Sequence, residues 1–268
     1  MPRHIRKPIP YNLKPKTSWE PISGWYAGYM GKEGGDYQRT IVFPGALRLL
    51  APRKDGSYLD LACGQGSFSK LLSTKAASVD GLDASKTLIE QARKNAPKNV
   101  RFHLGDATNF AHLFQPASFD GIVCNLAIQN IDPLDPVFAD AARALKSNGA
   151  FVLTMNHPAF RQPRQSGWGW DEERKLQYRR VDKYLGEYEM PIIAHPGSAP
   201  HIKTYSYHRP LSSYVNELAK HGFMIDALEE WTSNKISDSG PRAKAENIAR
   251  KEIPLFMAIR AVRGARAR

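Results

Sequence analysis

Residues 58–68, YLDLACGQGSF, decide the fold that we predict for this chain. A short apolar run leads into a turn that contains Gly64 and Gly66, and a helical pattern starts at once with Phe68. Glycine has no Cβ, so the backbone of such a turn can come close to a ligand. The new helix also points its free N–H groups and its positive dipole end at the turn. This order of strand, glycine turn and helix predicts a site for a nucleotide-like ligand.

The same alternation continues along the chain. A second strand leads into Asp83 and is followed by a helix over residues 85–95, for which Ser85 is the N-cap. Further strands are expected at residues 100–104, 119–124 and 150–156, with a helix that ends near Leu145 before the last of them. Strands that alternate with helices predict an α/β fold with a doubly wound, Rossmann-like parallel sheet.

Four regions follow from the breaks in this pattern. Residues 1–36 form an N-terminal arm and lid, residues 37–156 the ligand-binding core, residues 157–208 an inserted cap, and residues 209–268 the completion of the core with a basic tail. A helix is expected over residues 37–50 with Pro44 inside it, so a kink or a later start is possible. Within the cap we expect a charged helix over residues 171–184 and two extended segments, 188–194 and 202–207. After Pro210 the pattern predicts a helix, a strand from Phe223, a basic helix over 241–251 and a last strand over 255–261.

Composition narrows the class of protein. The 268 residues are 42% hydrophobic and 24% charged, as in ordinary globular proteins, and no apolar run reaches the roughly 18 residues of a membrane helix. The basic N-terminus lacks the apolar core of a secretory signal, and two cysteines predict neither disulfides nor a metal site, so we expect a cytoplasmic protein. The net charge of +12 lies partly in the two ends and favours solubility over RNA binding.

Three acids stand at the ends of three consecutive strands: Asp60, Asp83 and Asp106. A dinucleotide site would want glycine or alanine where Ser69 stands, and Asp60 would repel a pyrophosphate. Asp60 can receive an ammonium group, Asp83 a ribose diol and Asp106 an adenine amino group. Singly, Asp83 could only cap a helix and Asp106 only form a turn. Together the three acids indicate S-adenosylmethionine as cofactor, with S-adenosylhomocysteine as its product.

The motifs DLACGQG, GLDAS, GDA and FDGIVCNLAIQNI resemble those of class I S-adenosylmethionine-dependent methyltransferases, above all the ubiquinone/menaquinone-biosynthesis (methyltransferase type 11) group. This resemblance implies a seven-stranded sheet with an antiparallel last strand. It also implies a set of cofactor-binding residues. They are Asp60, Ala62, Gly64 and Gly66 at the methionine end, Asp83 and Ala84 at the ribose, Asp106 and Ala107 at the adenine, and Asn125 and Leu126 near the methyl donor. Many members have glycine at the Ala62 position, a small-for-small change that we expect to cost little.

Methyl transfer is an in-line displacement that depends mainly on holding the nucleophile against the methyl group. If a general base is needed, His157 and His208 are the candidates, and His195 and His201 could also reach in. For each of them a hydrogen-bonded or surface role is an open alternative.

The aromatic cap indicates an apolar or planar small-molecule acceptor. The residues that we expect to contact it are Tyr26, Tyr29, Gln129, Trp168 and Tyr205. Tyr26 and Tyr29 could instead only seal one end of the core. A basic rim would tolerate an acid or phosphate on the acceptor, although a solvated face explains these charges equally (Arg161, Arg164, Arg179, Arg180, Arg242, Lys244, Arg250 and Lys251). An RNA methyltransferase and a non-catalytic S-adenosylmethionine-binding module are the alternative functions.

Overall fold

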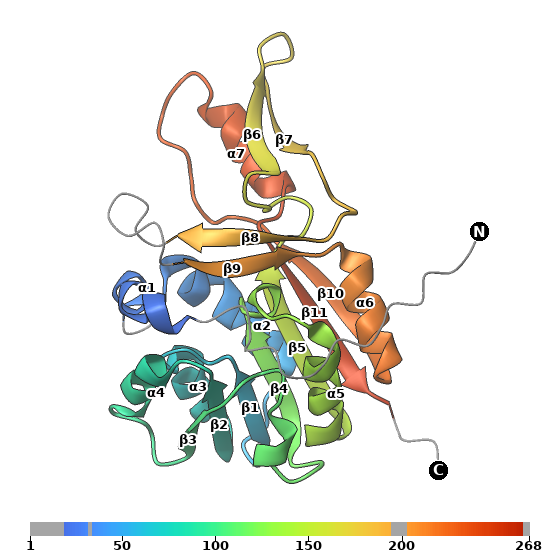
Figure 1. The fold of residues 1–268 in the computed structure, drawn as a ribbon. Helices are drawn as coiled ribbons and strands as arrows, with labels where there is room; N and C mark the ends of the chain where they lie inside the picture. The colour runs from blue at the N-terminus through green and yellow to red at the C-terminus, as the bar shows by residue number, and fades with distance from the viewer. Residues whose placement is uncertain (1–18, 32–33, 194–202, 265–268) are drawn as a thin grey trace, which may run out of the picture.

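A computed structural model describes residues 19–31, 34–193 and 203–264, and it is built around one seven-stranded sheet (Figure 1). The strand order is β10-β11-β5-β4-β1-β2-β3. β1 pairs in parallel with β2 and β4, whereas β11 is antiparallel to both of its neighbours. The strands are β1 (Ser57–Leu61), β2 (Ser78–Asp83), β3 (Val100–Leu104), β4 (Phe119–Asn125), β5 (Leu145–Asn156), β10 (Phe223–Trp231) and β11 (Phe256–Arg263). The predicted doubly wound α/β fold with an antiparallel last strand is confirmed.

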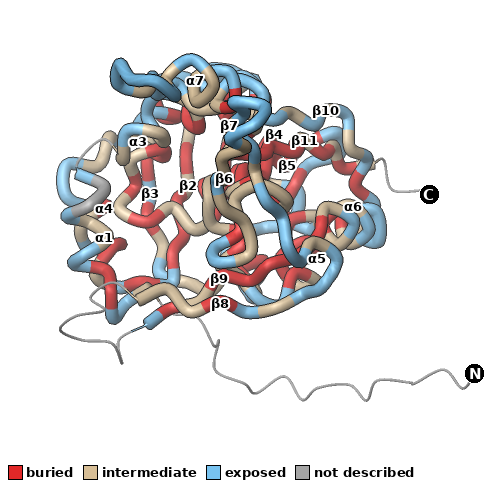
Figure 2. The backbone as a smooth tube through the Cα atoms, turned by 90° about the horizontal axis from the view of Figure 1, so that it is seen from above, coloured by how far each residue is buried: buried red, intermediate tan, exposed pale blue. Residues whose placement is uncertain are grey.

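Helices cover both faces of this sheet. Alternate residues of each strand point to opposite sides, so apolar side chains on both faces can pack against helices. Leu59 and Leu61 of β1 belong to a core cluster with residues of α5 (Leu134–Ala144) and α6 (Leu211–Lys220). Tyr58, the residue before Leu59, belongs to a second cluster on the other face. That cluster includes residues of α2 (Phe43–Leu50), α3 (Ser67–Ser73) and α4 (Lys86–Arg93). In Figure 2 the buried parts of the chain run along the strands between these layers.

The segment predicted as one helix over 37–50 has two parts. A π-helical turn, η2 (Gln38–Val42), runs directly into α2, and Pro44 lies in the first turn of α2. Proline lacks an N–H and its ring crowds the preceding turn, so the hydrogen-bond ladder is widened at this point. The chain therefore stays helical through Pro44 and is distorted there, as the sequence allowed.

Two antiparallel hairpins follow β5. They are β6 (Ser166–Asp171) with β7 (Leu176–Val181), and β8 (Tyr188–Ile193) with β9 (Lys203–His208). The two extended segments that we predicted match β8 and β9, and the loop between these strands lies outside the described residues.

The predicted helix over residues 171–184 is wrong, because that range holds a turn and the strand β7 and contains no helical residue. β7 pairs with the glycine-containing strand β6, where Gly169 leaves room for the ring of Tyr178. A Cβ on Gly169 would lie 2.3 Å from that ring. The charges that suggested a helix lie on a largely exposed two-stranded ribbon.

The hairpins and α7 (Ala243–Glu252) stand beyond the carboxyl ends of the parallel strands, at the top of Figure 1. None of the helices in the described part of the chain is long and apolar enough to cross a membrane.

Candidate functional site

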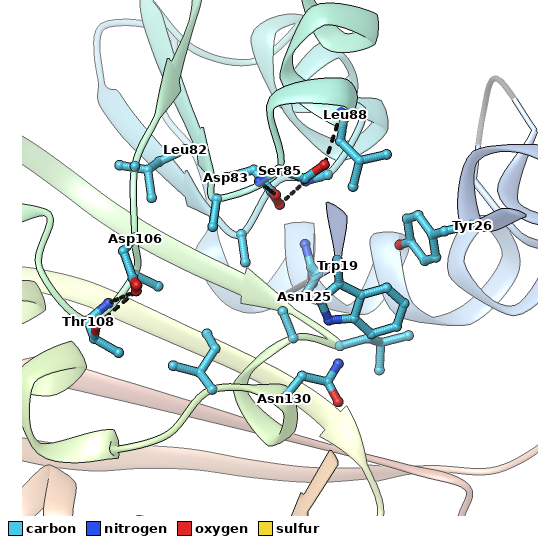
Figure 3. A pocket seen from close by; sticks show the side chains of 18 of the residues that line it. Trp19, Tyr26, Leu82, Asp83, Ser85, Leu88, Asp106, Thr108, Asn125 and Asn130 are labelled. Carbon is cyan, nitrogen blue, oxygen red and sulfur yellow. Dashed lines mark hydrogen bonds between the residues drawn. The ribbon is translucent and has the colours of Figure 1, made fainter. Parts of the chain in front are cut away.

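Two cavities lie at the carboxyl ends of β1, β2, β3 and β4, with volumes of about 120 Å³ and about 30 Å³. Asp83, Asp106 and their neighbours line the larger cavity (Figure 3), and Asp60 lines the smaller one. Tyr26, Ala62 and Asn125 line both. The cavities therefore adjoin at these three residues, and together they form one elongated site.

Asp83 ties the glycine turn to the next helix. Its Oδ2 accepts a hydrogen bond from the Gly64 N–H at 2.8 Å, and its Oδ1 accepts one from the Ser85 N–H at 2.8 Å. Burial raises the pKa of Asp83, and these two donors oppose the shift. The helix cap is the hydroxyl of Ser85, which accepts from the Leu88 N–H. Asp83 is therefore not the cap of this helix, and its place is in the wall of the larger cavity.

Asp60 is 1% exposed and faces the smaller cavity. The Ser69 hydroxyl donates to its Oδ2 at 2.6 Å. Burial raises the pKa of Asp60 to about 7, and the Asp83 carboxylate adds to this rise. Ser69 occupies the position that departs from a dinucleotide fingerprint, and the structure gives it a reason, since it is the hydrogen-bond partner of Asp60.

Asp106 lies two residues after the end of β3 and lines the larger cavity (Figure 3), as does Ala107. Its Oδ1 accepts hydrogen bonds from the N–H and the hydroxyl of Thr108, at 2.8 and 2.9 Å. Asp106 is thus a turn former, as the alternative interpretation held, and it lines the cavity as well.

Asn125 and Leu126 turn the chain after β4. Leu126 has a φ of 51°, in the left-handed region, and its N–H donates to the Thr154 carbonyl at 2.9 Å. The Thr154 hydroxyl donates to Asn125 Oδ1, whereas the buried Asn125 Nδ2 has no partner among the described residues. A buried amide donor without a partner costs about 1–3 kcal/mol. Asn125 lines both cavities, so this donor lies close to their junction.

These groups fit S-adenosylmethionine. The carboxylates of Asp60, Asp83 and Asp106 and the amide of Asn125 line the two cavities, and such groups can bind an ammonium group and hydroxyl groups. Comparison with known proteins agrees. Residues 52–168 match the family model described as "Methyltransferase domain". A crystal structure of an S-adenosylmethionine-dependent methyltransferase from Mesorhizobium loti superposes with a TM-score of 0.67 and is 26% identical, covering 85% of this chain and 99% of that one.

This chain belongs to the class I S-adenosylmethionine-dependent methyltransferases.

The methyltransferase is also similar to two curated proteins. It is 27% identical over 207 residues to an uncharacterized protein of Haemophilus influenzae, covering 71% of this chain and 76% of that one. It is 28% identical over 116 residues to the demethylmenaquinone methyltransferase of Tropheryma whipplei, which covers 42% of this chain and 47% of that protein. The chain thus spans about half the length of the latter relative. The expected relation to the menaquinone and ubiquinone methyltransferases is confirmed.

The methyltransferase carries its glycine turn in left-handed backbone conformations. Ala62 has a φ of 58° and Gly64 a φ of 56°. An L-residue pays about 1–2 kcal/mol in this region, so alanine at position 62 costs more than a small-for-small exchange suggests. Gly66, at a φ of 79°, is the N-cap of α3, and it lines neither cavity. A Cβ on it would lie 2.5 Å from the Phe102 ring, so this glycine serves packing.

The N-terminal segment supplies part of the wall of the larger cavity. Tyr26, in α1 (Ser23–Met30), packs edge-to-face against Trp19 with 5.2 Å between ring centroids, and both line the larger cavity. Glu20 accepts hydrogen bonds from Ser85 and Thr87 at the start of α4. Trp19 and Glu20 were missed from the sequence, although the cluster of aromatics around Tyr26 pointed to this segment. The side chain of Tyr29 lies outside the described part of the chain.

Both candidate histidines lie away from the two cavities of the methyltransferase. His157 Nδ1 accepts from the N–H groups of Ala159 and Phe160, and its Nε2 lies 2.7 Å from a Glu230 carboxylate oxygen. His208 Nε2 donates to the Tyr184 carbonyl at 2.7 Å. Burial lowers the pKa of each. Their side chains act as structural hydrogen-bonding groups, and this geometry speaks against a catalytic base at His157, where both nitrogens are engaged. His195 and His201 lie outside the described residues.

Among the remaining predicted acceptor contacts, Gln129 and Tyr205 come from neighbouring segments, because the hydroxyl of Ser206 donates to the Gln129 carbonyl at 3.4 Å. The side chain of Gln129 is buried and donates to the Leu126 carbonyl at 2.7 Å. Trp168, on β6, is exposed. The ammonium of Lys203 lies 5.4 Å from the ring centroid of Tyr205 on β9. Neither Trp168 nor Tyr205 lines the cofactor cavities. Of the five, only Tyr26 belongs to these cavities with its side chain described.

Proposed function

We propose that this methyltransferase methylates a small-molecule acceptor that it encloses at the junction of the two cavities. The main support for this proposal is the charge of the residues that line the two cavities. The described residues that line the cavities include four aspartates (Asp60, Asp83, Asp106 and Asp132) and neither lysine nor arginine. Such a site suits a cationic cofactor and repels the phosphate backbone of RNA. The name of the Tropheryma relative, a demethylmenaquinone methyltransferase, also favours a small acceptor.

Each end of the cofactor has a defined set of residues. Asp83 and Asp106 would hold the adenosine end, and Asp60 the methionine end. When bound, S-adenosylmethionine supplies an electrophilic methyl group. The site contributes mainly by orientation, because Tyr26, Ala62 and Asn125 surround the point where the cavities meet.

We expect that the acceptor needs little assistance from a general base to lose a proton. The described residues that line the two cavities include no histidine, and burial raises the pKa of Tyr26, so its phenol stays protonated near neutral pH. An acceptor atom that is nucleophilic at neutral pH without losing a proton fits such a site best, for example a thioether sulfur or an aromatic amine, as does a phenol or thiol that is acidic enough to be ionised already.

A methyl-release assay tests the proposal. The purified protein is incubated with methyl-labelled S-adenosylmethionine and with three acceptor groups: phenols and quinols, small amines and thiols, and bulk tRNA and rRNA. We expect turnover with a member of the first two groups and none with RNA. Label transfer to RNA with no small acceptor methylated would overturn the proposal. The Asp83→Ala variant is the control, because it should lose cofactor binding and label transfer together.

A further inference from the structure

A third cavity, of about 240 Å³, lies beside the cofactor site, and arginines dominate its lining. Arg161 follows β5, Arg179 is on β7 and Arg250 is on α7. Tyr37 and Trp168 add aromatic walls. Figure 1 shows β7 and α7 together above the carboxyl edge of the sheet. Three segments that are far apart in the sequence therefore bring their cationic groups to one cavity, which we call the arginine cavity.

Two of these arginines are held by neutral groups. Arg179 Nε donates to the Phe160 carbonyl at 2.6 Å and its Nη2 to the Ser166 hydroxyl at 3.0 Å. Arg250 Nε donates to the Ser237 hydroxyl at 3.1 Å. Burial lowers the pKa of Arg179, which shows that its guanidinium is partly removed from water. No Asp or Glu occurs among the described residues that line the arginine cavity, so the cationic charge there is not balanced by a lining carboxylate.

We propose that the arginine cavity binds the carboxylate or phosphate group of the methyl acceptor. A guanidinium presents paired N–H donors that match both anions, and such charge-assisted hydrogen bonds are among the strongest in proteins. Trp168 lies 5.1 Å from the Arg179 guanidinium, so a flat apolar part of the ligand can pack beside it. This inference rests on the proposed function, because it names the class of small molecule that the methyltransferase takes.

The arginine cavity is next to the reactive end of the cofactor site. Tyr37 lines it and donates or accepts a hydrogen bond with the Ser233 hydroxyl at 3.0 Å. The next residue, Gln38, lines the smaller cofactor cavity together with Asp60. Consecutive Cα atoms are about 3.8 Å apart, so one short segment of backbone contributes side chains to both cavities.

Charge is separated between these neighbouring cavities. Aspartates line the cofactor cavities and arginines line the third, so an anionic acceptor is repelled from one and held by the other. The anion would fix the orientation of the acceptor, with its opposite end toward Tyr26 and Asn125.

Calorimetric titration of the full-length protein, saturated with S-adenosylhomocysteine, tests this assignment. The probes are benzoate, inorganic phosphate and, as a neutral analogue of benzoate, benzamide. We expect benzoate or phosphate to bind and benzamide not to bind. Arg250→Gln should lower the affinity for the anion about 10-fold or more, because it removes a charge-assisted hydrogen bond. Arg250→Lys should recover part of this loss. Lys251→Gln, which removes the same charge from the next and exposed residue of α7, should change affinity by less than about twofold.

The outcomes separate the two proposals. Binding of benzoate alone assigns a carboxylate, and binding of phosphate alone assigns a phosphate; both support the inference. If neither benzoate nor phosphate binds to wild-type protein that binds S-adenosylhomocysteine normally, the inference is overturned and the proposed function still stands. Equal weakening by Arg250→Gln and Lys251→Gln would also overturn it, because the effect would then be one of net charge. Failure of the proposed function would be seen separately, as label transfer to RNA alone.

Discussion

Asp60 shows how a single buried carboxylate prepares a cofactor site. Its one described side-chain hydrogen bond, from Ser69, does not offset the cost of burial, so its pKa rises to about 7. A carboxylate in this state gains most from a cation, because the ligand's ammonium would replace the water that it has lost. We therefore expect Asp60 to couple cofactor binding to pH in the neutral range.

We predict that the affinity for S-adenosylmethionine falls as the pH drops below about 7. Asp60 must be ionised to receive an ammonium, and below its pKa in the free protein the proton has to leave first, so affinity approaches a tenfold loss per pH unit. Above pH 7 this dependence should level off. Isothermal titration calorimetry across this range measures it. Asp60→Asn should bind more weakly and show no such step; a step that persists in Asp60→Asn would assign the titration to another group.

Two glycines give opposite predictions for alanine substitution. At Gly66 a Cβ would meet the Phe102 ring at 2.5 Å and φ is 79°, so Gly66→Ala should lower the free energy of unfolding by about 2–4 kcal/mol. At Gly28, inside α1, a Cβ meets nothing within 4 Å, so Gly28→Ala should raise that free energy by about 0.5–1 kcal/mol. Urea denaturation of both variants measures the changes. Equal effects of the two would contradict the assignment of Gly66 to packing.

At the scale of elements, Glu20 is one of the residues that join the N-terminal segment to the core. Glu20, in the short helix η1 (Glu20–Ile22), accepts from Ser85 Oγ and from the N–H and hydroxyl of Thr87. These donors lower the pKa of Glu20, and they lie at the start of α4, where a helix dipole favours a negative charge. Trp19 and Tyr26 flank this connection, so its strength should decide how long the larger cavity stays closed.

Glu20→Ala is therefore expected to speed cofactor release by about 5- to 30-fold, the loss of about 1–2 kcal/mol of lid contacts, with little change in the unfolding temperature. Stopped-flow tryptophan fluorescence with S-adenosylhomocysteine measures the rate. Glu90→Ala is the matched control, since Glu90 lies on the exposed side of α4 and its charged neighbour is Lys86 at 3.9 Å. A release rate that is unchanged in Glu20→Ala would show that the lid does not limit dissociation.

Elements were predictable where periodicity was strong. The strand over residues 100–104 and the Ser85 cap match the structure, because each is encoded in a few consecutive residues. The segment 171–184 was not predictable in this way. Its many charges fit an exposed helix and an exposed ribbon equally, and only pairing with the glycines and tryptophans of β6 selects the ribbon.

At the scale of the molecule, the ribbon β6–β7 is separate from the seven-stranded sheet that carries the cofactor site. Its strands pair with each other, and its described packing is against α7, with Arg242 lying 4.6 Å from the Trp170 ring. Trp168 and Arg179 bring this attachment into the arginine cavity. Cofactor binding and acceptor binding should therefore be separable.

Replacing residues 168–179 by a short Gly-Ser turn is predicted to leave the affinity for S-adenosylhomocysteine within about twofold of wild type and to abolish methyl transfer to the acceptor. Calorimetry measures the first and label transfer the second. Loss of cofactor affinity in this variant would mean that the ribbon supports the sheet edge directly, and wild-type turnover would mean that the acceptor lies elsewhere.

The sequence by itself determined the sheet, the glycine turn and the three acids at the strand ends, because strand period, turn chemistry and caps act over short stretches of chain. Tertiary structure alone decided which groups meet. It brought Ser69 to Asp60, engaged both nitrogens of His157, and joined arginines from the segment after β5, from β7 and from α7 around one cavity. Tyr37 and Ser233, bonded across 196 positions, show the physical reason: such contacts depend on how the whole chain packs, and no local pattern records them.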